Sequence, residues 1–199
     1  MRVHNKPLLV IYKLQDIPEA QRFIELWQKL AAQNGLDGLY VVANIDEVAD
    51  IERMRALGAD AVNLKRTWHY LRHYSIPQRV ANKILRVVLK HGMFHDYGRA
   101  IRWFSGPEDR RLDVHPCLMP QFDHSPRSGR NYHNLKNSTP ALFQRHAERV
   151  FQDLTAKPAE ERLAFLASWN EWGEGNYMEP DLRFGHGYLD ALAAALSKF

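Results

Sequence analysis

Residues 38–64, GLYVVANIDEVADIERMRALGADAVNL, contain a complete β-α-β unit and decide the fold class. The apolar run at 38–43 has the length of a buried strand, and a second run of this kind follows at 59–64. Between them we expect a helix from about Ile45 to Leu57, which Gly58 ends. Strands that are apolar along their whole length and are joined by helices are typical of a parallel sheet buried on both faces.

The same alternation extends in both directions along the chain. One apolar run precedes the unit, at 7–12, and two follow it, at 115–120 and 163–169. Further helices are predicted from periodic apolar residues and from start and stop signals. They run from about Phe23 to Asn34-Gly35, from about Pro77 to His91, and from Ser138-Thr139-Pro140 onward. The sequence therefore predicts an α/β fold of about five β-α units, in a single domain spanning residues 1–199.

Composition and charge narrow the range of partners. The chain has 199 residues, of which 45% are hydrophobic and 25% charged, as in soluble globular proteins. The formal net charge of +4 is small, and Lys and Arg are spread along the chain rather than gathered in one stripe. This balance permits weak attraction to nucleic acid or anionic lipid but argues for neither, so we expect no nucleic-acid partner.

The apolar and cysteine content bears on the compartment. Cys117 is the single cysteine, so no internal disulfide forms. The apolar run near the N-terminus, at 7–12, is too short for a secretory signal. No stretch approaches the ~20 apolar residues of a membrane-spanning helix. We therefore expect a cytoplasmic protein without a transmembrane segment.

The segment 168–180, SWNEWGEGNYMEP, concentrates acidic, aromatic and amide side chains after the last apolar run. Breaking or forming a glycosidic bond needs a proton donor at the bridging oxygen and negative charge near the developing oxocarbenium ion, and paired carboxyl groups supply both. Glu171 and Glu174 are candidates for this pair. Acidic residues at the positive end of a helix would give a similar pattern without catalysis. Trp169 and Trp172 offer flat rings on which a sugar can stack, and Asn170 and Asn176 offer amides that can bond its hydroxyl groups. Gly173 and Gly175 permit a tight turn.

These residues also resemble a known family. The stretch 167–181, ASWNEWGEGNYMEPD, is similar to the signature of the WbsX-like family, which is assigned to glycosyl transfer in bacterial surface-polysaccharide synthesis. That family in turn is similar to glycoside hydrolase family 99, the endo-mannosidases, which share an N-E-W-x-E-G core. The resemblance continues at 6–18 (KPLLVIYKLQDIP), 35–44 (GLDGLYVVAN) and 119–127 (MPQFDHSPR), and so covers nearly the whole chain.

The resemblance implies roles for particular residues. Glu171 would be the base that takes a proton from the sugar 2-hydroxyl group, and Glu174 the acid that protonates the leaving oxygen. Asp123 and Arg127 would help to shape the sugar site, and Tyr12 matches an aromatic strand end. His124 stands where the family usually has Asn. Because ligands of parallel α/β folds bind beyond the carboxyl ends of the strands, we expect these side chains to share one cleft.

The resemblance also implies a (β/α)8 TIM-type barrel, of which this chain would hold the C-terminal portion. Three functions remain open: glycosyl transfer in lipopolysaccharide or surface-polysaccharide biosynthesis, glycoside hydrolysis of the endo-mannosidase kind, and glycan binding by an inactive half-barrel. The substrate is then a glycan or a sugar donor, and no cofactor is implied. His69 and His73 share the i, i+4 spacing of zinc ligands, as do His91 and His95, but no third ligand is evident and no metal is expected.

A partial barrel has a consequence for the isolated chain. Five parallel strands leave two unpaired edges and one uncovered apolar face. We therefore expect the chain to self-associate, to pair with a missing N-terminal half-barrel, or to be marginally stable. Sedimentation velocity and thermal melting test this expectation. A well-behaved monomer with one cooperative melt would contradict it.

Overall fold

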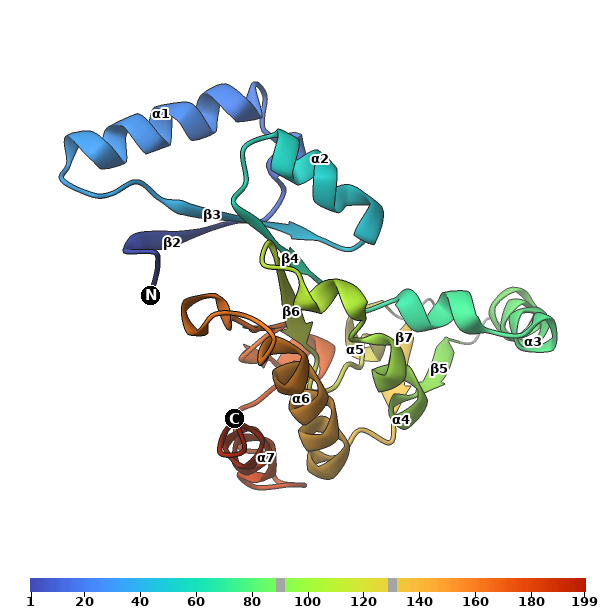
Figure 1. Ribbon diagram of the computed structural model, residues 1–199. Coiled ribbons are helices and arrows are strands. Elements are labelled where there is room, and N and C mark those ends of the chain that lie inside the picture. The colour runs from blue at the N-terminus through green and yellow to red at the C-terminus, as the bar shows by residue number, and fades with distance from the viewer. Residues whose placement is uncertain (89–91, 129–131) are drawn as a thin grey trace. The chain divides into compact units, whose positions relative to one another are not determined.

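The computed structural model describes residues 1–88, 92–128 and 132–199, and it has an α/β fold (Figure 1). The largest sheet has the strand order β1-β2-β3-β4-β6-β8. Its strands are β1 (Arg2–Val3), β2 (Lys6–Ile11), β3 (Tyr40–Ile45), β4 (Ala61–Leu64), β6 (Val114–Leu118) and β8 (Phe165–Leu166). The pairs β2–β3, β3–β4 and β4–β6 are parallel, whereas β1 is antiparallel to β2. All five predicted apolar runs contribute a strand, and the predicted parallel sheet is confirmed.

The chain forms two compact units. The first comprises residues 1–65, 107–117 and 153–165, and the second comprises 66–106, 118–152 and 166–199. The single domain that the sequence suggests stays a prediction, and each unit is described by itself below. Across residues 1–88, 92–128 and 132–199, no helix combines the length and the apolar content needed to cross a membrane.

The core of the first unit lies on both faces of β3. Val41 belongs to a buried cluster with Ile24 of α1 (Ala20–Gln33) and Met54 of α2 (Ile51–Ala56). Its neighbour Val42 belongs to a different cluster, with partly buried Leu163 packed against it. Successive side chains of a strand point to opposite faces, so both faces of β3 are removed from water. Figure 1 shows α1 and α2 on one of these faces.

The first unit corrects one predicted boundary. The sequence suggests a helix from about Ile45 to Leu57, but Ile45 is the last residue of β3 and pairs with Leu64. A 3-10 turn at Val48–Asp50 follows, and α2 begins only at Ile51. Ile45 is 5% exposed, so its burial in the sheet outweighs the helical periodicity of the segment that follows. The predicted end at Gly58 is confirmed by its positive φ of 101°.

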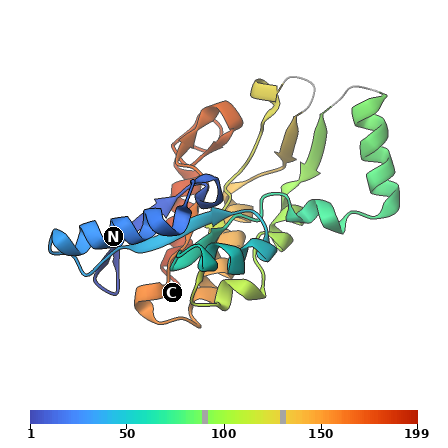
Figure 2. The same cartoon turned by 90° about the horizontal axis from the view of Figure 1, so that it is seen from above.

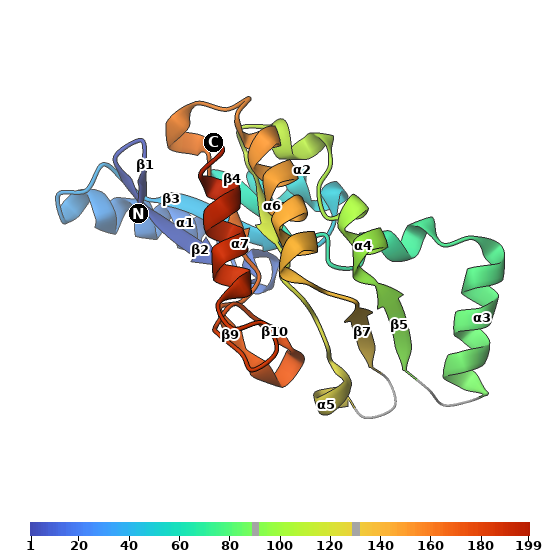
Figure 3. The same ribbon diagram turned by 90° about the horizontal axis from the view of Figure 1, so that it is seen from below.

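The second unit contains strands that the sequence does not reveal. β5 (Met93–Asp96) and β7 (His133–Lys136) form a two-stranded parallel sheet and lie side by side in Figures 2 and 3. Two of the four residues of β5 and three of the four residues of β7 are polar, so neither strand has a long apolar run or a clear alternation. β9 (Asn170–Glu171) and β10 (Asn176–Tyr177) form a second, antiparallel pair.

The helices of the second unit are α3 (Ile76–Val87), α4 (Tyr97–Ala100), α5 (Ser125–Ser128), α6 (Pro140–Leu154) and α7 (Gly187–Leu196). The predicted start of α6 is confirmed, because the Leu142 N–H donates to Thr139 Oγ1 at 3.3 Å. The helix predicted from about Pro77 to His91 corresponds to α3. Its predicted last residues, 89–91, lie outside the described residues.

His146 of α6 is an imidazole buried in the core of the second unit. It is 1% exposed, and its Nε2 accepts a hydrogen bond from the Met119 N–H at 3.4 Å. Burial, with a smaller contribution from Arg149, lowers the pKa of His146 to about 3. The folded chain therefore holds His146 neutral at a pH where the unfolded chain protonates it.

This difference predicts a loss of stability in acid. Below the unfolded pKa of about 6.5 the unfolded state binds the extra proton, so the free energy of unfolding falls as the pH drops from about 6.5 toward 3. At pH 5 the cost is about 2 kcal/mol for this one group. The variant His146→Gln keeps a hydrogen-bond acceptor without the titration and should lose correspondingly less stability between pH 7 and pH 5. Urea unfolding at both pH values measures the difference, with the exposed His186→Gln as the matched control. An unchanged pH dependence in His146→Gln would contradict the assignment.

Candidate functional site

The acidic segment folds as a tight hairpin. β9 and β10 pair Glu171 with Asn176, and the 3-10 turn Trp172–Glu174 joins them. The Gly175 N–H closes this turn by donating to the Trp172 carbonyl at 3.1 Å, and Gly175 has a positive φ of 52°. No α-helix begins in the segment, and the next one, α7, starts at Gly187. Glu171 is instead the N-cap of the single 3-10 turn and Glu174 is its last residue, and the Glu171 side chain makes no capping hydrogen bond there. The alternative of acidic residues at a helix start thus applies to this one turn only.

The predicted position of Glu171, directly after a strand of the main sheet, is wrong. The apolar run at 163–169 suggests that Glu171 directly follows a strand of the main sheet. That strand, β8, ends at Leu166, and Glu171 lies in the separate strand β9. The Glu171 N–H donates to Ser168 Oγ at 3.0 Å, a local bond that turns the chain between the two strands.

Arg127 resolves the repulsion between the two carboxylates. Its Nη1 lies 2.9 Å from Glu174 Oε1 and 3.6 Å from Glu171 Oε1, so one guanidinium contacts both. His124 Nε2 lies 3.4 Å from Glu174 Oε1 and adds a second contact when the ring is protonated. The side chains of Arg127 and Glu171 are 58% and 43% exposed, so solvent screens the pair and a ligand can compete for it.

The backbone of Asp123 fixes the approach of Arg127 to the hairpin. The Asp123 N–H donates to the Glu174 carbonyl at 2.7 Å, and its carboxylate accepts from the Ser125 N–H at 2.9 Å. The second bond caps the short helix α5, which carries Arg127. The structure thus brings together Asp123, Arg127, Glu171 and Glu174.

The aromatic side chains of the hairpin differ in their contacts and in their exposure to solvent. Trp172 stacks on Tyr177, with ring centroids 3.8 Å apart, and its Nε1 donates to Glu179 at 2.6 Å. Trp169 is 53% exposed and presents a flat face to solvent. Tyr177 was not singled out from the sequence, although it lies in the signature five residues after Trp172. Its hydroxyl donates to Asp181 at 3.1 Å, and burial together with this carboxylate raises its pKa.

The two predicted amide ligands lie in different surroundings. Asn170 is exposed. Asn176 is 6% exposed, and its Oδ1 has no hydrogen-bond partner among residues 1–88, 92–128 and 132–199. Both assignments as sugar ligands stay predictions.

A hollow of about 410 Å³ lies beside the hairpin. Its wall includes amides, a ring and a cation, which suit a ligand rich in hydroxyl groups. These are Gln121, Asn134, Asn137, Tyr177 and Arg183, together with Asp123 and Gly175. The side chains of Glu171 and Glu174 are not among its lining residues.

Tyr12 belongs to the first unit. It follows β2, is 67% exposed and has Lys65 Nζ 5.1 Å from its ring centroid. With Asn44, Asp46 and Lys65 it lines a hollow of about 260 Å³. The other candidate residues belong to the second unit, so the convergence of Tyr12 with them stays a prediction.

The described part of the chain holds no group of three His, Cys, Asp or Glu side chains placed to bind a metal ion. His91, one of the histidines with zinc-like spacing, lies outside the described residues. His95 is 2% exposed, and burial together with His133 lowers its pKa to about 4. It behaves as a buried neutral imidazole.

Solved structures place the chain in a class of folds. The chain is similar to a "Glycoside hydrolase-like protein" with a TM-score of 0.59 and 16% identity, covering 98% of this chain and 55% of that one. It is also similar to the GH99 endo-alpha-mannosidase from Bacteroides thetaiotaomicron, with a TM-score of 0.54, 14% identity and the same coverages. At these identities the likeness concerns the fold alone. The chain thus has an α/β fold with a curled half-barrel sheet like that of these structures.

The family is defined by the sequence match. Residues 1–192 match the family described as "Glycosyltransferase WbsX", and the chain belongs to that family. It is also 27% identical over 202 residues to "Uncharacterized protein WxcX" from two strains of Xanthomonas campestris pv. campestris, B100 and ATCC 33913. The alignment covers 100% of this chain and 28% of each of those proteins, so the chain spans little more than a quarter of their length.

Gly175 provides a test of the contact between the hairpin and Asp123. A Cβ atom built on Gly175 would lie 3.0 Å from the Asp123 Cβ and 3.2 Å from its backbone nitrogen. Gly185 has nearly the same φ, 54°, but a Cβ there meets nothing within 4 Å. Both substitutions by Ala carry the backbone strain of a positive φ, about 1 kcal/mol, but only Gly175→Ala adds a clash with backbone.

We therefore expect Gly175→Ala to lower the free energy of unfolding by at least about 1 kcal/mol more than Gly185→Ala. Urea unfolding of both variants measures this difference. Equal losses in the two variants would show that the hairpin does not approach Asp123 closely.

Proposed function

We propose that this chain is a carbohydrate-active enzyme of the WbsX type that transfers a glycosyl group in bacterial lipopolysaccharide or surface-polysaccharide biosynthesis. The family membership and the fold shared with glycoside hydrolase-like structures support a carbohydrate-active enzyme. The observation that carries the proposal is the pair of carboxylates, Glu171 and Glu174, on one hairpin and in contact with one arginine.

The proposed chemistry divides the two protons between the glutamates. Glu171 accepts the proton of the sugar 2-hydroxyl group as the oxygen of that group bonds to the anomeric carbon, and the bond from this carbon to the leaving oxygen breaks as Glu174 protonates that oxygen. The acceptor hydroxyl group then bonds to the anomeric carbon and gives its proton to Glu174, while the 2-oxygen leaves that carbon and takes back the proton from Glu171. For the first step the Glu174 carboxyl group must be protonated and released from Arg127. Because that ion pair is partly exposed, binding of a sugar can displace it at small cost. Arg127 then remains beside Glu171.

The surroundings of the pair suit a sugar. The exposed ring of Trp169 offers a face for stacking on the apolar side of a pyranose. Asn170 is exposed on the same hairpin and can bond hydroxyl groups. Trp172 is 49% exposed although Tyr177 stacks on one of its faces. Tyr12, Asn176 and Asp123 complete the proposed set of substrate-binding residues.

Two alternative functions remain open. A water molecule in place of an acceptor hydroxyl group would make the chain a glycoside hydrolase, and the likeness to an endo-alpha-mannosidase favours this alternative. A chain that binds glycan without turnover would be an inactive half-barrel. The alignment covers 28% of the length of the WxcX relatives. Activity is therefore best assayed both on this chain and on a longer protein that contains it. The proposed cytoplasmic location stays a prediction from the sequence.

The glutamates provide the decisive test. Glu171→Gln and Glu174→Gln should each lower turnover by about a hundredfold or more, because amides neither accept nor donate the proton. Glycan binding should persist, since the amide has nearly the shape of the carboxylate. The assay follows sugar release and transfer by mass spectrometry, with a panel of α-linked oligosaccharides and nucleotide sugars.

Glu179→Gln is the matched control. Its side chain lies at the end of the same hairpin and accepts from Trp172 Nε1, a bond that the glutamine oxygen preserves. This variant should retain wild-type turnover. Near wild-type turnover in Glu171→Gln or Glu174→Gln would mean that the pair is structural. Release of free sugar without transfer would favour the hydrolase.

A further inference from the structure

Helix α3 carries its apolar side chains on the side that faces solvent. Five residues spaced by three or four positions form a stripe along the helix and its C-cap. They are Ile76, Val80, Ile84, Val87 and Val88, and they are 78%, 51%, 49%, 60% and 69% exposed. A helix packed on a core through its apolar side would bury such a stripe, so this one needs another explanation.

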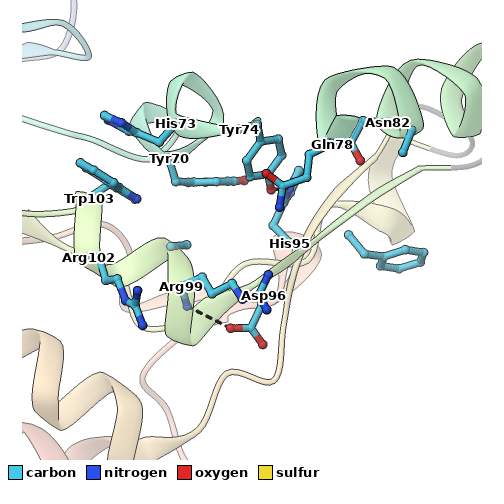
Figure 4. A pocket seen from close by; sticks show the side chains of 13 residues that line it. Tyr70, His73, Tyr74, Gln78, Asn82, His95, Asp96, Arg99, Arg102 and Trp103 are labelled. Carbon is cyan, nitrogen blue, oxygen red and sulfur yellow. Dashed lines mark hydrogen bonds between the residues drawn. The ribbon is translucent and has the colours of Figure 1, made fainter. Parts of the chain in front are cut away.

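The opposite side of α3 faces other elements of the second unit, to which the helix itself belongs. Gln78, Ala81 and Asn82 line a pocket of about 470 Å³ together with side chains of β5 and α4, and Figure 4 shows Gln78 and Asn82 pointing toward it. Figures 2 and 3 show α3 beside β5, on the side away from β7. Gln78, Ala81 and Asn82 thus lie on the pocket side of α3, and the apolar stripe lies on the other side. A capping box at Ser75 and Gln78 starts the helix independently of this orientation.

The sequence that includes the stripe is basic, since residues 66–95 contain no Asp or Glu. Among the described side chains, α3 itself contributes two cations to this segment, Arg79 and Lys83. Arg79 and Lys83 are exposed and lie on the helix next to the stripe. The Arg79 guanidinium donates to the carbonyls of Tyr74 and Arg72, which carry no net charge.

We propose that α3 is a membrane-docking helix that lies in the headgroup region of an anionic lipid bilayer. Ile76, Val80 and Ile84 would point toward the acyl chains, and Arg79 and Lys83 toward the lipid phosphates. An outward apolar stripe bordered by cations, on a helix that itself contains no Asp or Glu, is the pattern of helices that lie on anionic membranes.

Charge and side-chain type together favour this partner over others. A nucleic acid would use the cations but would leave the exposed Ile and Val side chains in water, because phosphates and sugars do not cover them. A protein partner would cover the stripe without needing the cations Arg79 and Lys83 beside it. The proposal does not depend on the reaction that the glutamate pair performs.

Co-sedimentation of the full chain with vesicles tests the proposal. We expect binding to vesicles of equal parts phosphatidylcholine and phosphatidylglycerol, and weaker binding to phosphatidylcholine alone. The double variant Val80→Ser/Ile84→Ser should lower the partition coefficient about tenfold or more. Arg79→Gln/Lys83→Gln should lower binding to the anionic vesicles by roughly fivefold for each charge removed, and should change binding to the neutral vesicles little.

The matched control is Leu26→Ser/Leu30→Ser in α1. These leucines are 52% and 41% exposed, so the control removes a similar apolar surface from another helix and should leave vesicle binding unchanged. Circular dichroism confirms that each variant is folded. Two results would overturn the proposal. One is vesicle binding that Val80→Ser/Ile84→Ser leaves intact. The other is a change in sedimentation velocity caused by this variant in the absence of lipid, without any vesicle binding by the wild type, which would make the stripe a contact between protein chains.

Discussion

Burial of both faces of β3 and β4 is the constraint on which the sheet of this protein depends. Val42, Val62 and Leu64 are 0% exposed, and consecutive residues of these strands face different apolar clusters. A strand in this position needs cover on each side, and parallel pairing with helical crossovers supplies it. The helices α1 and α2 cover one face, while Leu163 and Phe165 return from much later in the chain to cover the other.

The candidate site depends on ion pairs and backbone hydrogen bonds rather than on apolar burial. Two carboxylates three residues apart on a tight hairpin repel each other, and the Arg127 guanidinium lies against both. Arg127 is held there by the backbone, because the Asp123 N–H bonds the Glu174 carbonyl at the turn that Gly175 makes possible. One guanidinium offsets one of the two negative charges and leaves both carboxylates partly exposed to solvent.

Helix α3 has the apolar periodicity of a core helix but exposes its apolar stripe to solvent. Gln78 and Asn82 on its other side line a pocket. A small net charge of +4 for the whole chain conceals an acid-free segment of 31 residues, 65–95, around this helix. Docking on an anionic membrane would use both features.

The sequence by itself determined the elements whose side chains repeat with a burial period. The apolar runs predicted β2, β3, β4 and β6, and the caps and stripes predicted α1 and α6, because burial of one face or both imposes a local spacing. The signature at 168–180 likewise suggested Glu171 and Glu174 as a catalytic pair, a role that stays a proposal. Only the tertiary structure decided the polar strands β5 and β7, the extension of β3 to Ile45, and the contact of Arg127 with both glutamates. It also decided which side of α3 faces water. These features join segments far apart in the chain, and a hydrogen bond or ion pair between distant segments leaves no periodic trace in either one.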